Sequence, residues 1–181
     1  MKIHHLNTGT MCPGGVPDFP HAAIHVHRAE YDMAVLRKPA PPEGRYVTGQ
    51  WSHGPSWKFY GEAGEDWFGF KGVRALGDKE ADILMIPLAG HTLGHCGIAV
   101  RSGDKWLLHA GDSYFHHGQL DPSPRMPLVL GHFQRKGDMD RGRRLANQAR
   151  LRALKLERGD RVTIFNSHDP VDYERCRCGA H

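Results

Sequence analysis

The stretch from residue 82 to residue 109 predicts the centre of a β-sheet. The apolar run 83–86 is typical of a strand buried on both faces, and Pro87 ends it. Residues 97–101 and 105–109 predict the two strands of a hairpin, joined by the turn Ser102-Gly103-Asp104. This segment therefore supplies three consecutive strands.

Other predicted elements alternate around these strands. Apolar runs predict strands at 2–6, 22–26 and 162–165, and helices are predicted at 28–36 and from Asp138 or Asp140 to Glu157, where Gly159 ends the second helix. That second helix carries one apolar stripe, made of Leu145, Ala149, Ala153 and Leu156. The glycine-rich and aromatic stretch 46–70 predicts irregular loops with at most one short strand. This alternation predicts an α/β layered fold in a single domain over residues 1–181.

The overall charge and cysteine content narrow the class of protein. The 24 basic residues are balanced by 20 acidic ones, which is too even for a dedicated nucleic-acid binder. The basic cluster on the second helix is interpreted as its solvated face; its members are Arg141, Arg143, Arg144, Arg150, Arg152, Lys155 and Arg158. No disulfide framework, export signal or membrane-spanning run is recognisable. We expect a cytoplasmic protein that binds neither membranes nor nucleic acid.

The 14 histidines raise the expectation of a metal site. His91, Asp112 and His168 each lie just beyond a predicted strand. Loops that leave strand ends at one edge of a sheet converge, so these side chains can meet although they are far apart in sequence. Two imidazoles and one carboxylate suit zinc better than iron or manganese.

Three motifs resemble the second half of the metallo-β-lactamase fold superfamily. They are Gly-His-Thr-x-Gly-His at 90–95, Gly-Asp at 111–112 and Ser-His-Asp at 167–169, while the start MKIHHLNTGTMCP and residues 17–22 resemble its lactonase-like hydrolases. The resemblance implies an αβ/βα sandwich, two zinc ions and a small-molecule lactone, ester or thioester substrate. It also implies that His91 binds the first metal, Asp112 bridges both, and His168 binds the second.

The family motif His-x-His-x-Asp-His is absent from the sequence, as if an internal deletion near residues 12–18 had removed it. The expected fold is therefore a truncated sandwich that lacks part of its N-terminal sheet. Each metal would keep two of its inferred ligands, and three are usual for catalytic zinc. We expect weak metal occupancy and little hydrolysis. Exposed strand edges would also favour a homodimer.

Two other interpretations stay open at this point. The chain could be a non-catalytic, shortened paralogue that acts as a weak metal-binding or interaction module. It could instead be an engineered or misassembled deletion without a biological role. A nucleic-acid-processing member of the superfamily is less favoured, because no aromatic residues interleave with the basic cluster.

The remaining candidates are assigned supporting roles. His95 is expected to hydrogen-bond a metal ligand or to be purely structural, and Ser113, His116 and His117 are expected to line the pocket. His25 and His27 share one face of a predicted strand and are interpreted as structural. The C-terminal Cys176-Arg177-Cys178 is interpreted as part of a mobile tail.

Overall fold

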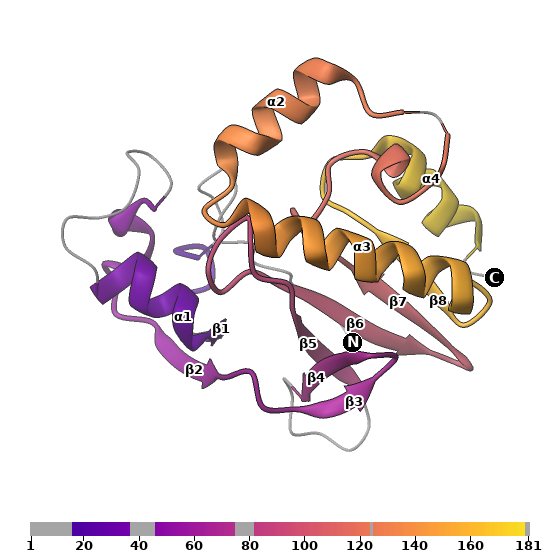
Figure 1. Ribbon diagram of the computed structural model, residues 1–181. Coiled ribbons are helices and arrows are strands. Elements are labelled where there is room, and N and C mark those ends of the chain that lie inside the picture. The colour runs from indigo at the N-terminus through magenta and orange to yellow at the C-terminus, as the bar shows by residue number, and fades with distance from the viewer. Residues whose placement is uncertain (1–15, 37–45, 75–81, 124, 180–181) are drawn as a thin grey trace. The chain divides into compact units, whose positions relative to one another are not determined.

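A computed structural model describes residues 16–36, 46–74, 82–123 and 125–179 (Figure 1). The chain divides after Gly61 into two compact units, residues 1–61 and 62–181. The strand predicted at 2–6 lies outside the described residues, as does most of the proposed deletion point. That residues 1–181 form a single domain stays a prediction.

The first unit contains a parallel pair of strands. Strand β1 (Ala23–His27) pairs with β2 (Ser56–Tyr60), and α1 (Arg28–Tyr31) follows β1 directly and continues as a π-helical turn (Asp32–Leu36). A short 3-10 helix (Thr48–Trp51) precedes β2. The strand predicted at 22–26 and the helix predicted at 28–36 are confirmed.

The second unit is built on a six-stranded sheet with the order β3-β4-β5-β6-β7-β8. Its strands are β3 (Glu65–Trp67), β4 (Phe70–Arg74), β5 (Ile83–Pro87), β6 (Cys96–Ser102), β7 (Lys105–His109) and β8 (Val162–Phe165). All neighbours are antiparallel except β7 and β8, which are parallel. The strands predicted at 83–86 and 162–165 and the predicted hairpin are confirmed, and the fold class is mixed α/β.

The prediction of irregular structure over 46–70 was wrong. Strands β2 and β3 lie within this stretch, and β3 and β4 form a tight hairpin at Phe68-Gly69. Both turn residues have positive φ, 45° and 80°, as the turns of two-residue hairpins require. The side chains of Trp67 and Phe70 belong to the buried core, so the aromatic residues pack rather than line a loop.

Among the described residues of the second unit, three α-helices and the short 3-10 helix His117–Gln119 accompany the sheet. Helix α2 (Leu128–Gly137) was not predicted, whereas α3 (Arg141–Arg158) was, and the Asp140 carboxylate caps α3 by accepting a 2.9 Å bond from the Arg143 N–H. Helix α4 (Pro170–Gly179) includes residues 176–178, so these residues are helical and do not form the predicted tail. No described helix is long and apolar enough to cross a membrane.

The apolar stripe predicted for α3 was wrong. All four of its residues are exposed, and the buried face instead carries Arg144, Asn147, Gln148, Leu151 and Leu154. Asn147 and Gln148 donate hydrogen bonds to the carbonyls of Ala89 and Ser113. Hydrophobic periodicity could not predict this face, because three of its five residues are polar.

The core of the second unit lies between the sheet and α3. Leu151 and Leu154 of α3 join Leu84, Ile86 and Leu108 in one buried cluster, as the position of α3 along the sheet indicates (Figure 1). Burial of such apolar side chains contributes roughly 1.5–3 kcal/mol each. This packing fixes the ends of β5, β7 and β8, from which the candidate site is built.

Candidate metal centre

The structure brings the three predicted metal ligands together around Asp112. Asp112 follows β7, and its Oδ2 lies 3.4 Å from Nε2 of His91 in the loop after β5. Its other oxygen, Oδ1, lies 3.0 Å from Nε2 of His168 in the loop after β8. Each imidazole therefore faces a different oxygen of one carboxylate.

Neighbouring imidazoles favour the ionised form of this carboxylate although it is buried. Burial alone would raise the pKa of Asp112, but the hydrogen bond from His168 and the charge interactions with His168 and His91 lower it overall. The hydrogen bond to Asp112 raises the pKa of His168, whose side chain is 37% exposed. His91 is buried, so the open side of the cluster lies at His168.

His95 holds the Asp112 loop in place. Its Nδ1 lies 3.2 Å from the Leu88 carbonyl, and its Nε2 accepts a 2.9 Å hydrogen bond from the backbone N–H of Asp112. These bonds use both ring nitrogens and define a neutral imidazole that donates through Nδ1. The adjacent Gly111 has a φ of +56°, and a Cβ there would lie 2.6 Å from Nε2 of His95. His95 thus positions the loop that carries Asp112.

Asn166 orients His168, a role that the sequence did not suggest. Its Oδ1 accepts hydrogen bonds from the backbone N–H groups of His168 at 2.6 Å and Asp169 at 2.9 Å. Asp169 in turn accepts a 2.8 Å bond from the Val171 N–H and so caps the start of α4. An Asp before Pro170 is a common start of a helix, and this signal could have revealed α4.

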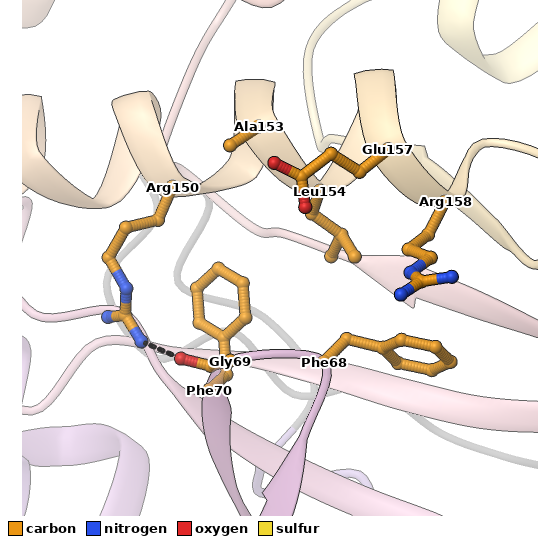
Figure 2. Close-up of a pocket in the computed structure, with 8 residues that line it drawn as sticks. All are labelled: Phe68, Gly69, Phe70, Arg150, Ala153, Leu154, Glu157 and Arg158. Carbon is orange, nitrogen blue, oxygen red and sulfur yellow. Dashed lines mark hydrogen bonds between the residues drawn. The ribbon is translucent and has the colours of Figure 1, made fainter.

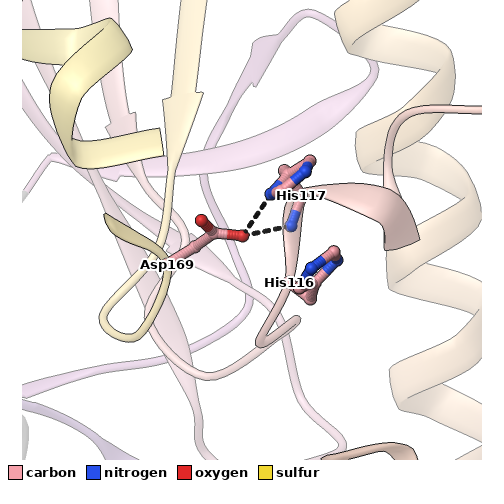
Figure 3. Close-up of side chains that lie close together, drawn as sticks. All are labelled: His116, His117 and Asp169. Carbon is pink, nitrogen blue, oxygen red and sulfur yellow. Dashed lines mark hydrogen bonds and ion pairs between the residues drawn. The ribbon is translucent and has the colours of Figure 1, made fainter. Parts of the chain in front are cut away.

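His116 and His117 lie beside Asp169 (Figure 3). Nδ1 of His117 lies 2.7 Å from Oδ2 of Asp169, which also accepts a bond from the His117 backbone N–H. His116 accepts a 3.0 Å bond from the Gly118 N–H. Possible ligand atoms of these three residues lie within 4.8 Å of one another. Both oxygens of Asp169 already accept hydrogen bonds. The cluster of His116, His117 and Asp169 is therefore best explained as a structural contact that joins two loops.

Phe115 and Ser113 complete the surroundings of the cluster. The ring centroid of Phe115 lies 4.5 Å from that of His168 and 6.0 Å from that of His91. The Ser113 hydroxyl is buried and has no hydrogen-bond partner among the described residues. Phe115 therefore covers both imidazoles with an apolar surface.

His25 and His27 both have structural contacts in the first unit. Nδ1 of His25 lies 2.7 Å from the Tyr60 hydroxyl, and the two rings stack. Nδ1 of His27 accepts a bond from the Ala29 N–H and caps α1. These contacts agree with their interpretation as structural residues.

A separate hollow of about 370 Å³ lies between the β3–β4 hairpin and α3 (Figure 2). The Arg150 guanidinium lies 4.1 Å from the Phe70 ring centroid and donates a 2.8 Å bond to the Gly69 carbonyl. Burial lowers the pKa of Arg150. These contacts tie α3 to the hairpin, and no histidine or cysteine lines the hollow.

Known proteins resemble the chain in both sequence and fold, although no protein-family model matches it. Probable metallo-hydrolases of Mycobacterium bovis and Mycobacterium tuberculosis are each 36% identical to it over 164 residues, which cover 91% of this chain and 53% of each relative. The chain thus spans about half the length of these curated relatives.

Solved structures of hydrolases share the fold. An N-acyl homoserine lactone hydrolase with its product N-hexanoyl-L-homoserine at the catalytic metal centre matches with a TM-score of 0.60 at 18% identity, covering 91% of this chain and 54% of that one. The hydrolase AbOPH of the β-lactamase superfamily matches with a TM-score of 0.53 at 21% identity, covering 86% and 50%. By sequence and fold, the chain belongs to the metallo-β-lactamase fold superfamily, with about half the length of the members that it matches.

Proposed function

We propose that His91, Asp112 and His168 bind a divalent metal, zinc in the first instance, and serve the hydrolysis of a small-molecule lactone, ester or thioester. The observation that carries this proposal is the position of one imidazole at each oxygen of Asp112, at 3.4 and 3.0 Å. With one oxygen beside each imidazole, Asp112 would offer one ligand atom to each of two metal ions. The names of the matched metallo-hydrolases and lactone hydrolase support the same chemistry.

The donor atoms fit zinc in kind and in spacing. Ligand atoms of a tetrahedral zinc with bonds of about 2.0–2.2 Å lie roughly 3.3–3.6 Å apart. The 3.4 Å separation of His91 and Asp112 falls in this range, and the 3.0 Å separation of His168 needs only a small adjustment. Imidazole and carboxylate are both common zinc ligands.

The protein's own residues prepare this site for hydrolysis. A metal bound there would polarise a carbonyl group and lower the pKa of a bound water. Asp112 remains ionised, and His95 fixes the backbone that carries it. Asn166 orients His168, while Phe115 covers both imidazoles and excludes water from that side.

The number of ligands limits the activity that we propose for the chain by itself. Among the described residues, each metal position has one imidazole and one carboxylate oxygen, one ligand fewer than the three usual in catalytic zinc sites. This count favours a second candidate, a weak metal-binding or interaction module without catalysis. We expect zinc binding in the micromolar range and slow, metal-dependent turnover.

Zinc titration and turnover separate these candidates. Metal-free protein is titrated with Zn²⁺ by calorimetry and then assayed with an acyl-homoserine lactone and a nitrophenyl ester. Asp112→Asn and His168→Ala should weaken zinc binding at least tenfold, while His132→Ala, which removes an exposed histidine of α2, should leave it unchanged. Zinc binding without turnover would favour the module. Equal zinc affinity in all four proteins would exclude the proposed centre.

A further inference from the structure

A second cavity in the chain is lined by positive charge. It has a volume of about 540 Å³, within the range of small-molecule sites, and lies among α2, α3 and the loop at Gly118-Gln119. Five arginines line it, and no aspartate or glutamate does. They are Arg125, Arg135, Arg141, Arg144 and Arg152.

Most of this charge is uncompensated within the described chain. Nε of Arg144 donates a 2.6 Å bond to Asp138, and both side chains are almost fully buried. None of the other four arginines forms an ion pair with a described carboxylate. Two of them have polar contacts with neutral groups: Arg152 donates to the Gln119 carbonyl, and Arg135 approaches the His132 ring. Four like charges around one cavity create a potential that attracts an anion.

The cavity wall also contains buried N–H groups without acceptors. Gln134 is 1% exposed and Arg144 is 4% exposed, and both line the cavity. Oε1 of Gln134 accepts a 2.7 Å bond from Gln119, but its Nε2 has no partner among the described residues. Nη1 of Arg144 has none either. Buried donors are normally satisfied, so an anion that rearranges this wall on binding would supply the missing acceptors.

We propose that this cavity binds the phosphate group of a small molecule. A phosphate dianion matches an excess of positive charge, and its oxygens accept the paired N–H groups of a guanidinium. The same chemistry would suit free phosphate or a phosphomonoester. This site goes beyond the proposed hydrolase function, because none of the residues that hold the candidate metal lines the cavity.

The cavity is nevertheless connected to the metal centre. Gln119 donates to Gln134 in the cavity wall, while its Oε1 accepts a 2.7 Å bond from the Phe115 N–H. Phe115 packs against His168. Gln119 therefore links the cavity wall to the loop that carries Phe115, beside the candidate metal ligands.

Calorimetry on metal-free protein tests the proposal. EDTA-treated protein is titrated with inorganic phosphate and, separately, with glycerol 3-phosphate. We expect saturable binding of one ligand per chain, at least tenfold weaker in Arg135→Ala/Arg141→Ala, which removes two exposed cavity arginines. The matched control Arg158→Ala/Arg161→Ala removes the same charge outside this cavity and should bind as the wild type does. Gln134→Glu, which replaces the buried amide by a carboxylate, should also weaken binding.

Each outcome supports or overturns the site. Tighter binding of glycerol 3-phosphate identifies a phosphomonoester ligand, and equal binding identifies phosphate itself. Absence of saturable binding, or equal affinity in the cavity variant and its control, overturns the proposal. Tighter binding of a single-stranded dodecanucleotide that falls steeply with salt and depends on Arg135 and Arg141 would also overturn it, in favour of a nucleic-acid surface. Since no metal is present, these results are independent of zinc binding.

Discussion

Gly111 lies so close to His95 that a Cβ atom at this glycine would come within 2.6 Å of the imidazole Nε2. That nitrogen accepts the backbone N–H of Asp112, so the glycine, the histidine and the central carboxylate form one unit. The close approach explains why a residue without a side chain precedes Asp112.

Replacement of Gly111 by alanine should therefore combine two costs. Its φ of +56° disfavours any L-residue by about 1 kcal/mol, and the collision with His95 adds roughly 1–3 kcal/mol. Gly103→Ala is the matched control, because Gly103 has a φ of +59° and nothing within 4 Å of its Cβ position. Urea unfolding should show a larger loss of unfolding free energy for Gly111→Ala than for Gly103→Ala. Equal losses of unfolding free energy in the two variants would mean that the His95 side chain moves aside at no cost in stability.

The carboxylate of Asp121 should stabilise the fold in a pH-dependent way. It lies 2.5 Å from Nζ of Lys155 in α3 and 2.8 Å from the Arg175 guanidinium in α4. Burial raises the pKa of Asp121, but the hydrogen bonds and charges of these two bases outweigh it and lower the pKa overall. A lowered folded-state pKa contributes stability above the unfolded value of about 3.9, and this contribution is lost as pH falls through the folded pKa.

Asp121→Asn should accordingly cost about 1 kcal/mol at pH 7 and progressively less below pH ~4. The control is Asp66→Asn, since Asp66 pairs with Lys71 at 2.8 Å but both side chains are largely exposed. Exposed pairs of this kind contribute little. Chemical denaturation of both variants at several pH values checks the difference, and a penalty for Asp121→Asn that does not change with pH would contradict the assignment.

Arg144 and Asp138 form a buried ion pair. The contribution of each side chain to stability should depend strongly on the presence of the other. Their side chains are 5% and 1% exposed, and the two groups are joined by a 2.6 Å bond. Arg144→Met should cost roughly 3–5 kcal/mol because it leaves a buried carboxylate without its partner. The double variant Asp138→Leu/Arg144→Met should recover much of that loss. A double-mutant cycle in urea measures the coupling, and additive losses would show that the pair does not act as a unit.

The apolar strands and the convergence of His91, Asp112 and His168 could be predicted because each follows from a local pattern. The run 83–86, the hairpin and the strand at 162–165 are continuous apolar segments, and a polar residue just beyond a strand lies at the sheet edge. The buried face of α3 could not be predicted in this way, since Asn147 and Gln148 are buried through bonds to distant carbonyls. The same holds for Asn166, whose role depends on a turn rather than on periodicity.

By itself, burial of the Asp172 carboxyl should produce the opposite dependence on pH, and the hydrogen bond from Tyr114 should counteract it. The Tyr114 hydroxyl donates to Oδ2 of Asp172 at 2.6 Å, and both residues are almost fully buried. Burial raises the pKa of Asp172, and the hydrogen bond from Tyr114 partly offsets this rise. A raised carboxyl pKa means that stability is greatest below the unfolded pKa and is lost as pH rises through the folded pKa.

Tyr114→Phe removes the donor and should raise the pKa of Asp172 further, so its cost should grow as pH rises from about 4 to 7, reaching roughly 1–3 kcal/mol. Tyr173→Phe is the matched control, because it removes the same hydroxyl from an exposed position of α4. Denaturation of the two variants across this pH range compares them directly. If the two curves coincide, or if the cost of Tyr114→Phe falls with rising pH, the hydrogen bond does not stabilise the ionised carboxylate.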